Sequence, residues 1–314
     1  TLDRYLPGVA VHDPRWKAHA PRDRGASWDF EDVRDHYLKL LYDVEPDVLR
    51  REDGGLYLDM SRAATAEVME ATFAEWRRSG SPCQGALVWT LQDLVPGAGW
   101  GIIDALGRPK SVWHALKRAF RPIQVNLLDE GTNGLDIQLI NETGNAVEAM
   151  LELTCLREGT QPVVHAKRSS MMRSRQSQTI AATDLFGAFF DTTYAYRFGP
   201  PSHDVTVARL RDVATGQILA DAFHFPLGRK KALHAANIQV TLSETSGSWH
   251  IDIGTDRLAQ AVHIAADGYH ASENWFHLAP GETRKIGLVP DIATVGSPPS
   301  GEVMSLGSSR RFSF

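Results

Sequence analysis

The stretch "GALVWTLQDLVPGAGWGIIDALGRPKSVWHALKRAF", residues 85–120, carries the strongest fold signal in the first part of this chain. It opens in a continuous apolar run of strand length, "CQGALVWTL", which is typical of a parallel strand buried on both faces. It closes in "PKSVWHALKRAF", which places Trp113, Leu116 and Phe120 on one helical face before Pro122 ends the helix. A loop rich in glycine, tryptophan and aspartate joins the two.

A helix precedes this strand. In "SRAATAEVMEATFAEWRRSG", apolar side chains recur at three- and four-residue spacing, with Ser61 as the expected N-cap and Gly80 as the stop. The order helix, buried strand, loop, helix predicts the last units of an α/β barrel. A barrel needs eight βα units, and at most two are present. The fold is therefore either something else or the tail of a longer chain, and the first residue, Thr1 rather than Met, favours the tail.

From Ile123 onward the hydrophobic period changes to two. The segments "LDIQLIN", "MLELTCL", "VTVARL" and "ILADAFHF" alternate between turn signals, which is the rhythm of an immunoglobulin-like sandwich. After a linker, "PLGRKKALHAAN", a second β-rich module follows with "IQVTLSE", "SWHIDIGT", "AVHIAAD" and "TRKIGLVP". The predicted fold is a multidomain α/β plus all-β protein. Its predicted domains are a barrel end at 1–121, an immunoglobulin-like β-sandwich at 122–228 and a second small β-sandwich at 229–314.

Bulk composition narrows the function classes. The chain has 314 residues, 43% hydrophobic and 23% charged, and its formal charge is −5 from 33 basic and 38 acidic residues. This balance, without any basic run, argues against a nucleic-acid partner. No apolar segment reaches the roughly 18 residues of a membrane span, so no membrane partner is expected. Cys83 and Cys155 match no metal spacing and are expected to be small buried residues rather than a bridge.

Three further motifs support a resemblance. Gly85, Trp89 and Asp93 form G-x-x-x-W-x-x-x-D, then come Trp100 and "IIDALGRPKSVWHALKRAF", and much later "ADGYHASENWFHLAPGETRKIGL". Together they resemble the C-terminal portion of glycoside hydrolase family 2 enzymes, in particular β-mannosidase-like members. The resemblance covers nearly the whole chain. It implies a TIM-barrel end followed by an immunoglobulin-like domain and a further β-domain, acting on an oligosaccharide or β-mannoside substrate without metal or organic cofactor.

The resemblance also implies what this chain lacks. The acid/base glutamate of the family lies in an Asn-Glu pair after the fourth barrel strand, and the nucleophile follows the seventh. The pair Asn141-Glu142 falls inside a sandwich strand pattern instead, and no segment before residue 60 reads as a barrel strand ending in Glu. Both catalytic carboxylates are therefore expected upstream, and the remainder of the barrel is an expected partner. One departure is Gln92, where β-mannosidases usually carry Asn before the acid.

Trp89, Asp93 and Trp100 are the candidate substrate-binding residues. Trp89 ends its predicted strand, where barrel sites form, so the resemblance makes it the platform beneath the sugar; the alternative is a core tryptophan that plugs the barrel. Asp93 could bind sugar hydroxyls or hold the loop through backbone amides. Trp100, flanked by glycines that permit close approach, could line the site or pack the rim. Asp104 is expected to be structural.

Other clusters of reactive residues have simpler interpretations. The acids of "WDFEDVRDHYLKLLYDVEP" (Asp29, Glu31, Asp32 and Asp35) suit a helix start, where the dipole favours them, better than a catalytic pair. His12 and His19 have no usual metal spacing. The late aromatics Tyr269, His270, Trp275 and His277 are expected in the core and rim of a small β-domain rather than on a carbohydrate platform.

Two functional hypotheses remain. In the first, the chain is the C-terminal segment of a retaining exo-β-glycosidase. In the second, it is a non-catalytic module that binds carbohydrate or a partner through its aromatic side chains. The buried strand and its flanking barrel-type helices favour the first hypothesis, because a binding module has no use for them.

Overall fold

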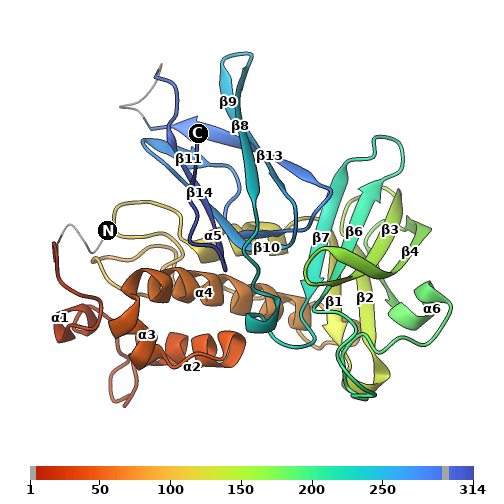
Figure 1. Cartoon of the computed structure of the whole chain (residues 1–314), viewed down its shortest axis with the longest axis horizontal. Coiled ribbons are helices and arrows are strands. Elements are labelled where there is room, and N and C mark those ends of the chain that lie inside the picture. The colour runs from red at the N-terminus through yellow and green to blue at the C-terminus, as the bar shows by residue number, and fades with distance from the viewer. Residues whose placement is uncertain (1–4, 292–296) are drawn as a thin grey trace. The chain divides into compact units, whose positions relative to one another are not determined.

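The structure is a computed structural model that describes residues 5–291 and 297–314. The chain divides into two compact units. Unit 1 comprises residues 1–73 and 82–118, and unit 2 comprises residues 74–81 and 119–314. Unit 1 contributes most of the helical residues and unit 2 contributes the strands (Figure 1).

Unit 1 holds most of the helical structure. Its elements are α1 (Pro14–Lys17), α2 (Phe30–Tyr42), α3 (Pro46–Glu52), most of α4 (Gly54–Trp76) and most of α5 (Ser111–Ala119). Helices α2 and α4 are linked through a buried hydrogen bond, in which the Tyr42 hydroxyl donates to Glu67 Oε1 at 2.7 Å. Leu38 and Tyr42 are fully buried on the inner face of α2, as its apolar spacing predicts.

The acidic start of α2 is a helix cap, as predicted. Asp29 is the N-cap, and its carboxylate accepts from the backbone N–H of Asp32 at 3.1 Å. The Asp32 carboxylate accepts in return from the N–H of Asp29 at 2.9 Å, which completes a capping box. The two side chains satisfy donors that an uncapped helix would leave unpaired.

Helix α4 begins seven residues earlier than the sequence predicted. It starts at Gly54, and Ser61 lies buried inside it rather than at its N-cap. The carboxylate of Asp53 accepts from the N–H of Leu56 at 2.9 Å and so supplies the cap. Tyr57 and Met60 extend the buried face of the helix toward its N-terminus. The prediction missed this extension because the burial depends on contacts with other parts of the chain.

The strand predicted at residues 83–91 is not part of any sheet in the structure. Residues 82–88 have no regular secondary structure, and only an isolated bridge joins Gln92 to Ile103. Strand hydrogen bonds require a neighbouring strand, and unit 1 contains none among its described residues. Leu87, Trp89 and Leu94 are consequently 99%, 84% and 97% exposed. The barrel end thus stays a prediction.

Helix α5 buries only part of the predicted stripe. Leu116 is buried as predicted, together with Val112 and Ala115, whereas Trp113 is half-buried. Phe120 lies beyond the end of the helix and is exposed. The helix ends at Ala119, so Phe120 no longer follows the helical spacing on which the predicted stripe depended.

Unit 2 contains a first β-sandwich built from two antiparallel sheets (Figure 1). One sheet has the order β1-β2-β5 and the other β4-β3-β6-β7. Their side chains share one core that includes Ile137, Leu151, Leu153 and Leu210. The bounds are β1 Ile123–Asp129, β2 Leu135–Asn141, β3 Val147–Arg157, β4 Gln161–Met172, β5 Gln176–Ala181, β6 Val205–Asp212 and β7 Ile218–His224, with the short helix α6 at Ala182–Phe186 and the turn η2 at Gly131–Asn133.

A second β-sandwich follows the short turn η3 (Lys230–Ala232). Its sheets have the orders β12-β10-β14-β15 and β11-β13-β9-β8, and they share a core that includes Ile251, Ile253, Val262 and Phe276. The bounds are β8 Ile238–Thr245, β9 Ser248–Thr255, β10 Ala259–Ala266, β11 Tyr269–Ala271, β12 Phe276–Leu278, β13 Thr283–Pro290, β14 Gly301–Leu306 and β15 Phe312–Ser313. All eight segments predicted as strands from residue 123 onward are strands.

The two cysteines form no bridge. Cys155 is fully buried in β3, where burial raises the pKa of its thiol to about 12. Cys83 is half-buried rather than buried, and it forms no disulfide. Cys155 is the small buried residue that the sequence predicted.

Candidate functional site

The loop at residues 90–110 of unit 1 is closed by backbone hydrogen bonds between its two arms. Ile103 donates its N–H to Leu91 O at 3.0 Å, and Asp93 donates to Ile103 O at 3.0 Å. Ile102 donates to Thr90 O at 3.2 Å and accepts from Lys110 at 3.0 Å. These bonds hold Asp93 and Trp100 on a defined loop rather than on a free segment.

Asp93 organises this loop. Its Oδ1 accepts from the N–H of Gly101 at 2.8 Å, and its Oδ2 pairs with the ammonium group of Lys110. Lys110 also donates to Gly99 O at 3.1 Å. Of the two roles considered for Asp93, the structure contains the loop-holding one. A contact with sugar stays a prediction. Lys110 stands in the quoted "GRPK" segment, but its role was not predicted because Asp93 lies 17 residues away in the sequence.

Glycine is required at positions 99 and 101 because the chain passes directly over Asp93. A Cβ at Gly99 or at Gly101 would lie 2.6 Å from Asp93 Oδ1, closer than real side chains approach. A Cβ at Gly101 would also lie 2.4 Å from the backbone nitrogen of Asp93. These glycines therefore allow the loop backbone to approach Asp93, which belongs to the same loop.

Gly101→Ala is expected to destabilise unit 1 by about 1–3 kcal/mol, since the added methyl group must displace backbone. Gly85→Ala is the matched control, because a Cβ there meets nothing within 4 Å. Urea unfolding followed by tryptophan fluorescence measures both. Equal midpoints for the two variants would show that the loop does not close over Asp93 in solution.

The two predicted tryptophans have different surroundings. Trp89 is exposed, and the peptide bond between it and Thr90 is cis. Trp100 is half-buried and packs edge-to-face on Phe30, with ring centroids 4.8 Å apart. Trp89 thus has a free ring surface in this structure, whereas Trp100 is committed in part to packing against the start of α2. Substrate-binding roles for both stay predictions.

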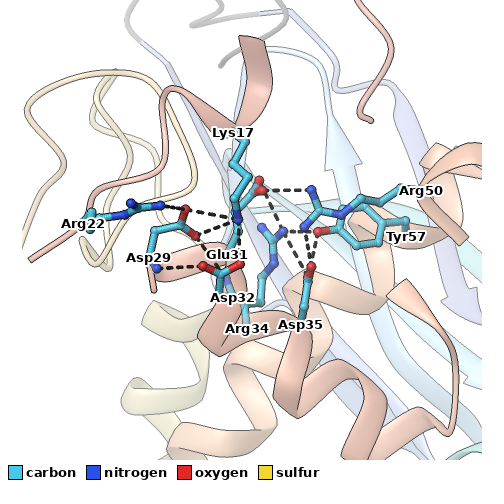
Figure 2. A network of polar contacts seen from close by, with 9 residues as sticks. All are labelled: Lys17, Arg22, Asp29, Glu31, Asp32, Arg34, Asp35, Arg50 and Tyr57. Atoms are coloured by element: carbon cyan, nitrogen blue, oxygen red, sulfur yellow. Dashed lines mark hydrogen bonds and ion pairs between the residues drawn. The ribbon is translucent and has the colours of Figure 1, made fainter. Parts of the chain in front are cut away.

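A second polar assembly surrounds the start of α2 (Figure 2). Lys17 contacts Asp29 and Asp32 at 3.1 and 2.6 Å. Arg50 binds Glu31 at 2.9 Å and also pairs with Asp35, which accepts from the Tyr57 hydroxyl at 2.8 Å. The complete cluster consists of Lys17, Arg22, Asp29, Glu31, Asp32, Arg34, Asp35, Arg50 and Tyr57.

This charged cluster balances four cations against four carboxylates. The ammonium of Lys17 lowers the pKa of Asp32 by hydrogen bonding. Burial raises the pKa of Tyr57 far above its usual value, so its phenol stays neutral. Because each carboxylate contacts at least one cation, the cluster suits a rigid scaffold better than a pair of catalytic acids. Arg34, Arg50 and Tyr57 were missed in the sequence because they contact the acids only through the fold.

A cavity of about 560 Å³ adjoins this cluster within unit 1. This volume is in the range of small-molecule sites. Eight of its lining residues are polar or charged, namely His12, Asp13, Lys17, Arg22, Asp29, Asp47, Arg50 and Arg51, and the others are Pro14, Ala18 and Ala20. His19, from the same segment, contacts Pro96 O through its Nδ1 at 3.1 Å, so the segment is tied to the Asp93 loop.

The Asn-Glu pair of the first sandwich is structural. Asn141 is fully buried and donates to Asn145 O and Met172 O at 2.8 and 3.0 Å. Its Oδ1 accepts from the Thr143 hydroxyl at 2.7 Å. Glu142 pairs with Arg77 at 2.5 Å. The same burial takes the Asn-Glu-Thr sequon out of reach of glycosylation in the folded chain.

The late aromatics lie in the core and rim of the second sandwich, as predicted. Tyr269 is buried, Trp275 and His277 are half-buried, and His270 is exposed. Trp275 stacks on His263 with ring centroids 4.3 Å apart. His277 accepts from Ala261 N–H at 3.1 Å. They form no exposed platform.

Two structural findings bear on other classes of function. Across residues 5–291 and 297–314, no three His, Cys, Asp or Glu side chains gather in a way that would hold a metal ion. Within the same residues, no helix has both the length and the apolar character needed to cross a membrane.

Sequence comparisons find similarity to a mannosidase domain family and to beta-mannosidases. The Ig-fold domain model Ig_mannosidase matches residues 233–308. Beta-mannosidase B of Aspergillus flavus is 35% identical over 77 residues, which are 24% of this chain and 9% of that protein. Beta-mannosidase B of Aspergillus clavatus is 22% identical over 250 residues, or 72% of this chain and 28% of that protein. The chain thus spans less than a third of the length of these curated relatives.

Solved structures show the same fold. The beta-D-mannosidase of Dictyoglomus thermophilum superposes with a TM-score of 0.71 at 18% identity, covering 89% of this chain and 33% of that one. The exo-chitosanase of Amycolatopsis orientalis superposes with a TM-score of 0.69 at 14% identity, covering all of this chain and 41% of that one. At these identities the likeness concerns the fold alone.

Proposed function

We propose, from the similarity of this chain to the C-terminal portion of β-mannosidase-like enzymes of glycoside hydrolase family 2, that it is the C-terminal segment of a retaining exo-β-glycosidase that hydrolyses terminal β-mannosides. The observation that carries the proposal is the match to beta-mannosidase B over 72% of the chain. The mannosidase Ig-fold match at residues 233–308 supports it independently of the unit 1 residues.

In this proposal the catalytic carboxylates lie outside the chain. Retaining hydrolysis needs two carboxyl groups about 5 Å apart, one as nucleophile and one as acid and then base. The acids of unit 1 that invite such a role contact cations in the charged cluster or hold a loop, as Asp93 does. The chain's contribution is to bind substrate. Trp89 offers a ring face for the sugar, and Asp93 and Trp100 shape the loop beside it.

The exposed segment around Trp89 supports the remainder of a TIM barrel as the partner of unit 1. Leu87, Trp89 and Leu94 are almost fully exposed, and folded monomers rarely leave such a contiguous apolar patch in water. Leu87 lies in a segment with the sequence pattern of a strand buried on both faces. Parallel neighbouring strands would cover Leu87 and supply the missing backbone hydrogen bonds, while Trp89, at the end of the strand, would keep its ring face open.

The test is activity by complementation. The 314-residue chain alone is expected to show no hydrolysis of p-nitrophenyl β-mannoside above buffer, because it lacks the nucleophile and the acid/base. Co-expression with the upstream barrel segment of the same gene is expected to restore turnover. If the chain alone hydrolysed the substrate, and a change of one of its own acids abolished this turnover, the proposal that the catalytic carboxylates lie outside the chain would be wrong.

A further inference from the structure

The long connection between α6 and β6, residues 187–204, carries a cluster of exposed aromatic rings and is called here the aromatic loop. It contains no helix or strand (Figure 1). Connections longer than about 12–15 residues without secondary structure are uncommon in compact domains and are usually functional or disordered. This loop belongs to unit 2, and neither the proposed reaction nor the core of the sandwich uses its outer face.

The aromatic loop is held in one conformation by its own polar groups. The carboxylate of Asp191 accepts from the N–H groups of Ala195 and Tyr196, both at 3.0 Å. The Thr193 hydroxyl donates to Gly131 O at 2.7 Å, and the Tyr196 hydroxyl donates to Thr132 O at 2.8 Å. The loop is therefore fastened both to itself and to the turn η2.

Two residues of the loop adopt a backbone conformation that side chains disfavour. Tyr194 has φ of 55° and Arg197 has φ of 54°. Bulky residues rarely occupy this left-handed region, and where they do, the cost is often associated with a functional site. In the aromatic loop these two residues flank Tyr196 in the sequence.

Three rings form a connected surface. Tyr196 and Phe198 stack with centroids 5.4 Å apart at 29°, and Phe189 meets Tyr196 edge-to-face at 5.3 Å. Phe198 is 83% exposed, Phe189 64% and Tyr196 40%. On the inner side, Phe190 packs on Phe186 and His203 at 6.0 and 5.3 Å and anchors the loop to the sandwich.

We propose that this aromatic surface binds a neutral carbohydrate chain through stacking of pyranose rings on Phe189, Tyr196 and Phe198. A sugar presents a flat face of C–H groups that fits an aromatic face. Besides Ala188, the exposed apolar side chains between residues 187 and 203 are aromatic or proline, without Leu, Ile, Val or Met. The same segment carries one acid, Asp191, and one base, Arg197, so its formal net charge is zero. The surface therefore has no charge excess that would require an anionic ligand.

The size of the surface also favours a sugar over a second protein. A fully exposed aromatic side chain offers on the order of 150–250 Å², so these three rings offer roughly 400 Å² at their observed exposures. A stable protein interface buries about 800 Å² on each partner. The aromatic surface is too small for a stable dimer contact but accommodates one or two sugar rings.

The test is calorimetric titration of the 314-residue chain with mannohexaose, the β-1,4-linked hexasaccharide. Phe189→Ala/Phe198→Ala is expected to weaken binding by about tenfold or more, since it removes two ring faces. Tyr196→Phe, which keeps the ring, is expected to bind within about twofold of the wild type. Trp28→Ala is the matched control, because Trp28 is also an exposed aromatic residue but lies outside the loop. Melting temperatures confirm that every variant is folded.

Each other outcome overturns the inference. Absence of binding by the wild-type chain, or equal affinity of the wild type and the double variant, would show that the loop does not bind this glycan. Light scattering that reveals a dimer broken by the double variant would assign the surface to a second copy of the chain. Trp89→Ala separates this site from the proposed substrate site. Loss of binding in Trp89→Ala alone would be consistent with the proposed function, and it would show that the aromatic loop does not bind the glycan.

Discussion

In the full-length parent enzyme, Trp89→Ala is expected to lower kcat/KM for an aryl β-mannoside by about 100-fold, which corresponds to roughly 3 kcal/mol of transition-state binding. The reason is that the indole provides the surface against which the distorted sugar ring is held in the transition state. Trp89 is 84% exposed in this chain, so its ring face is not consumed by packing within unit 1. Steady-state kinetics and thermal melting of the same preparation measure the effect.

Leu116→Ala serves as the control for this variant. Leu116 is buried on α5, so its truncation is expected to cost about 2–5 kcal/mol of stability and to leave the kinetics of the folded fraction nearly unchanged. The opposite pattern for Trp89→Ala, early melting with normal kinetics, would make Trp89 a plug of the barrel core. The substrate-platform role would then be wrong.

Leu153→Ala is expected to lower the free energy of unfolding of unit 2 by about 3–4 kcal/mol. Leu153 is fully buried in β3, between β4 and β6, and contributes to the core shared by both sheets of the first sandwich. The truncation loses the free energy gained when the leucine side chain moves from water into the core. It also leaves a cavity, which stays open because β3 is paired with a strand on each side and cannot shift to fill it. A fall in Tm of roughly 10 °C is the corresponding calorimetric result.

Val163→Ala on the adjacent strand β4 is the matched control, because Val163 is exposed. Its expected cost is within about 1 kcal/mol. If Leu153→Ala destabilised the chain no more than Val163→Ala does, the two sheets would not share the core described for them.

Sequence reasoning was most successful in unit 2. The strands at Leu135–Asn141 and Thr283–Pro290 have the bounds that their alternating patterns predicted. In an antiparallel sandwich each strand buries one face, so apolar and polar residues tend to alternate along the strand and can be recognised in the sequence. The helix start at the acids of residues 29–35 was also predicted, because the helix dipole favours acids in the first turn. The domain boundaries at residues 121 and 228 stay predictions.

Long-range contacts account for the parts that the sequence did not predict. The start of α4 at Gly54 depends on burial of Tyr57, whose partners Arg34, Asp35 and Arg50 come from other helices. The aromatic loop offered a signal in its dense run of Phe and Tyr. That run alone does not tell whether the rings are buried or exposed. Only the folded loop distinguishes Phe190, which packs inward, from Phe198, which lies in solvent.

The sequence by itself determined the β-sandwich character of residues 123–314, the presence of helices in unit 1 and the resemblance to β-mannosidase-like enzymes. Only the tertiary structure decided what Asp93 holds, why glycine stands at positions 99 and 101, and that Leu87, Trp89 and Leu94 lie exposed without partner strands. The physical reason is the range of the interactions. Hydrophobic period and helix capping act between near neighbours in the chain, whereas burial and strand pairing depend on which distant segments are present to cover a surface.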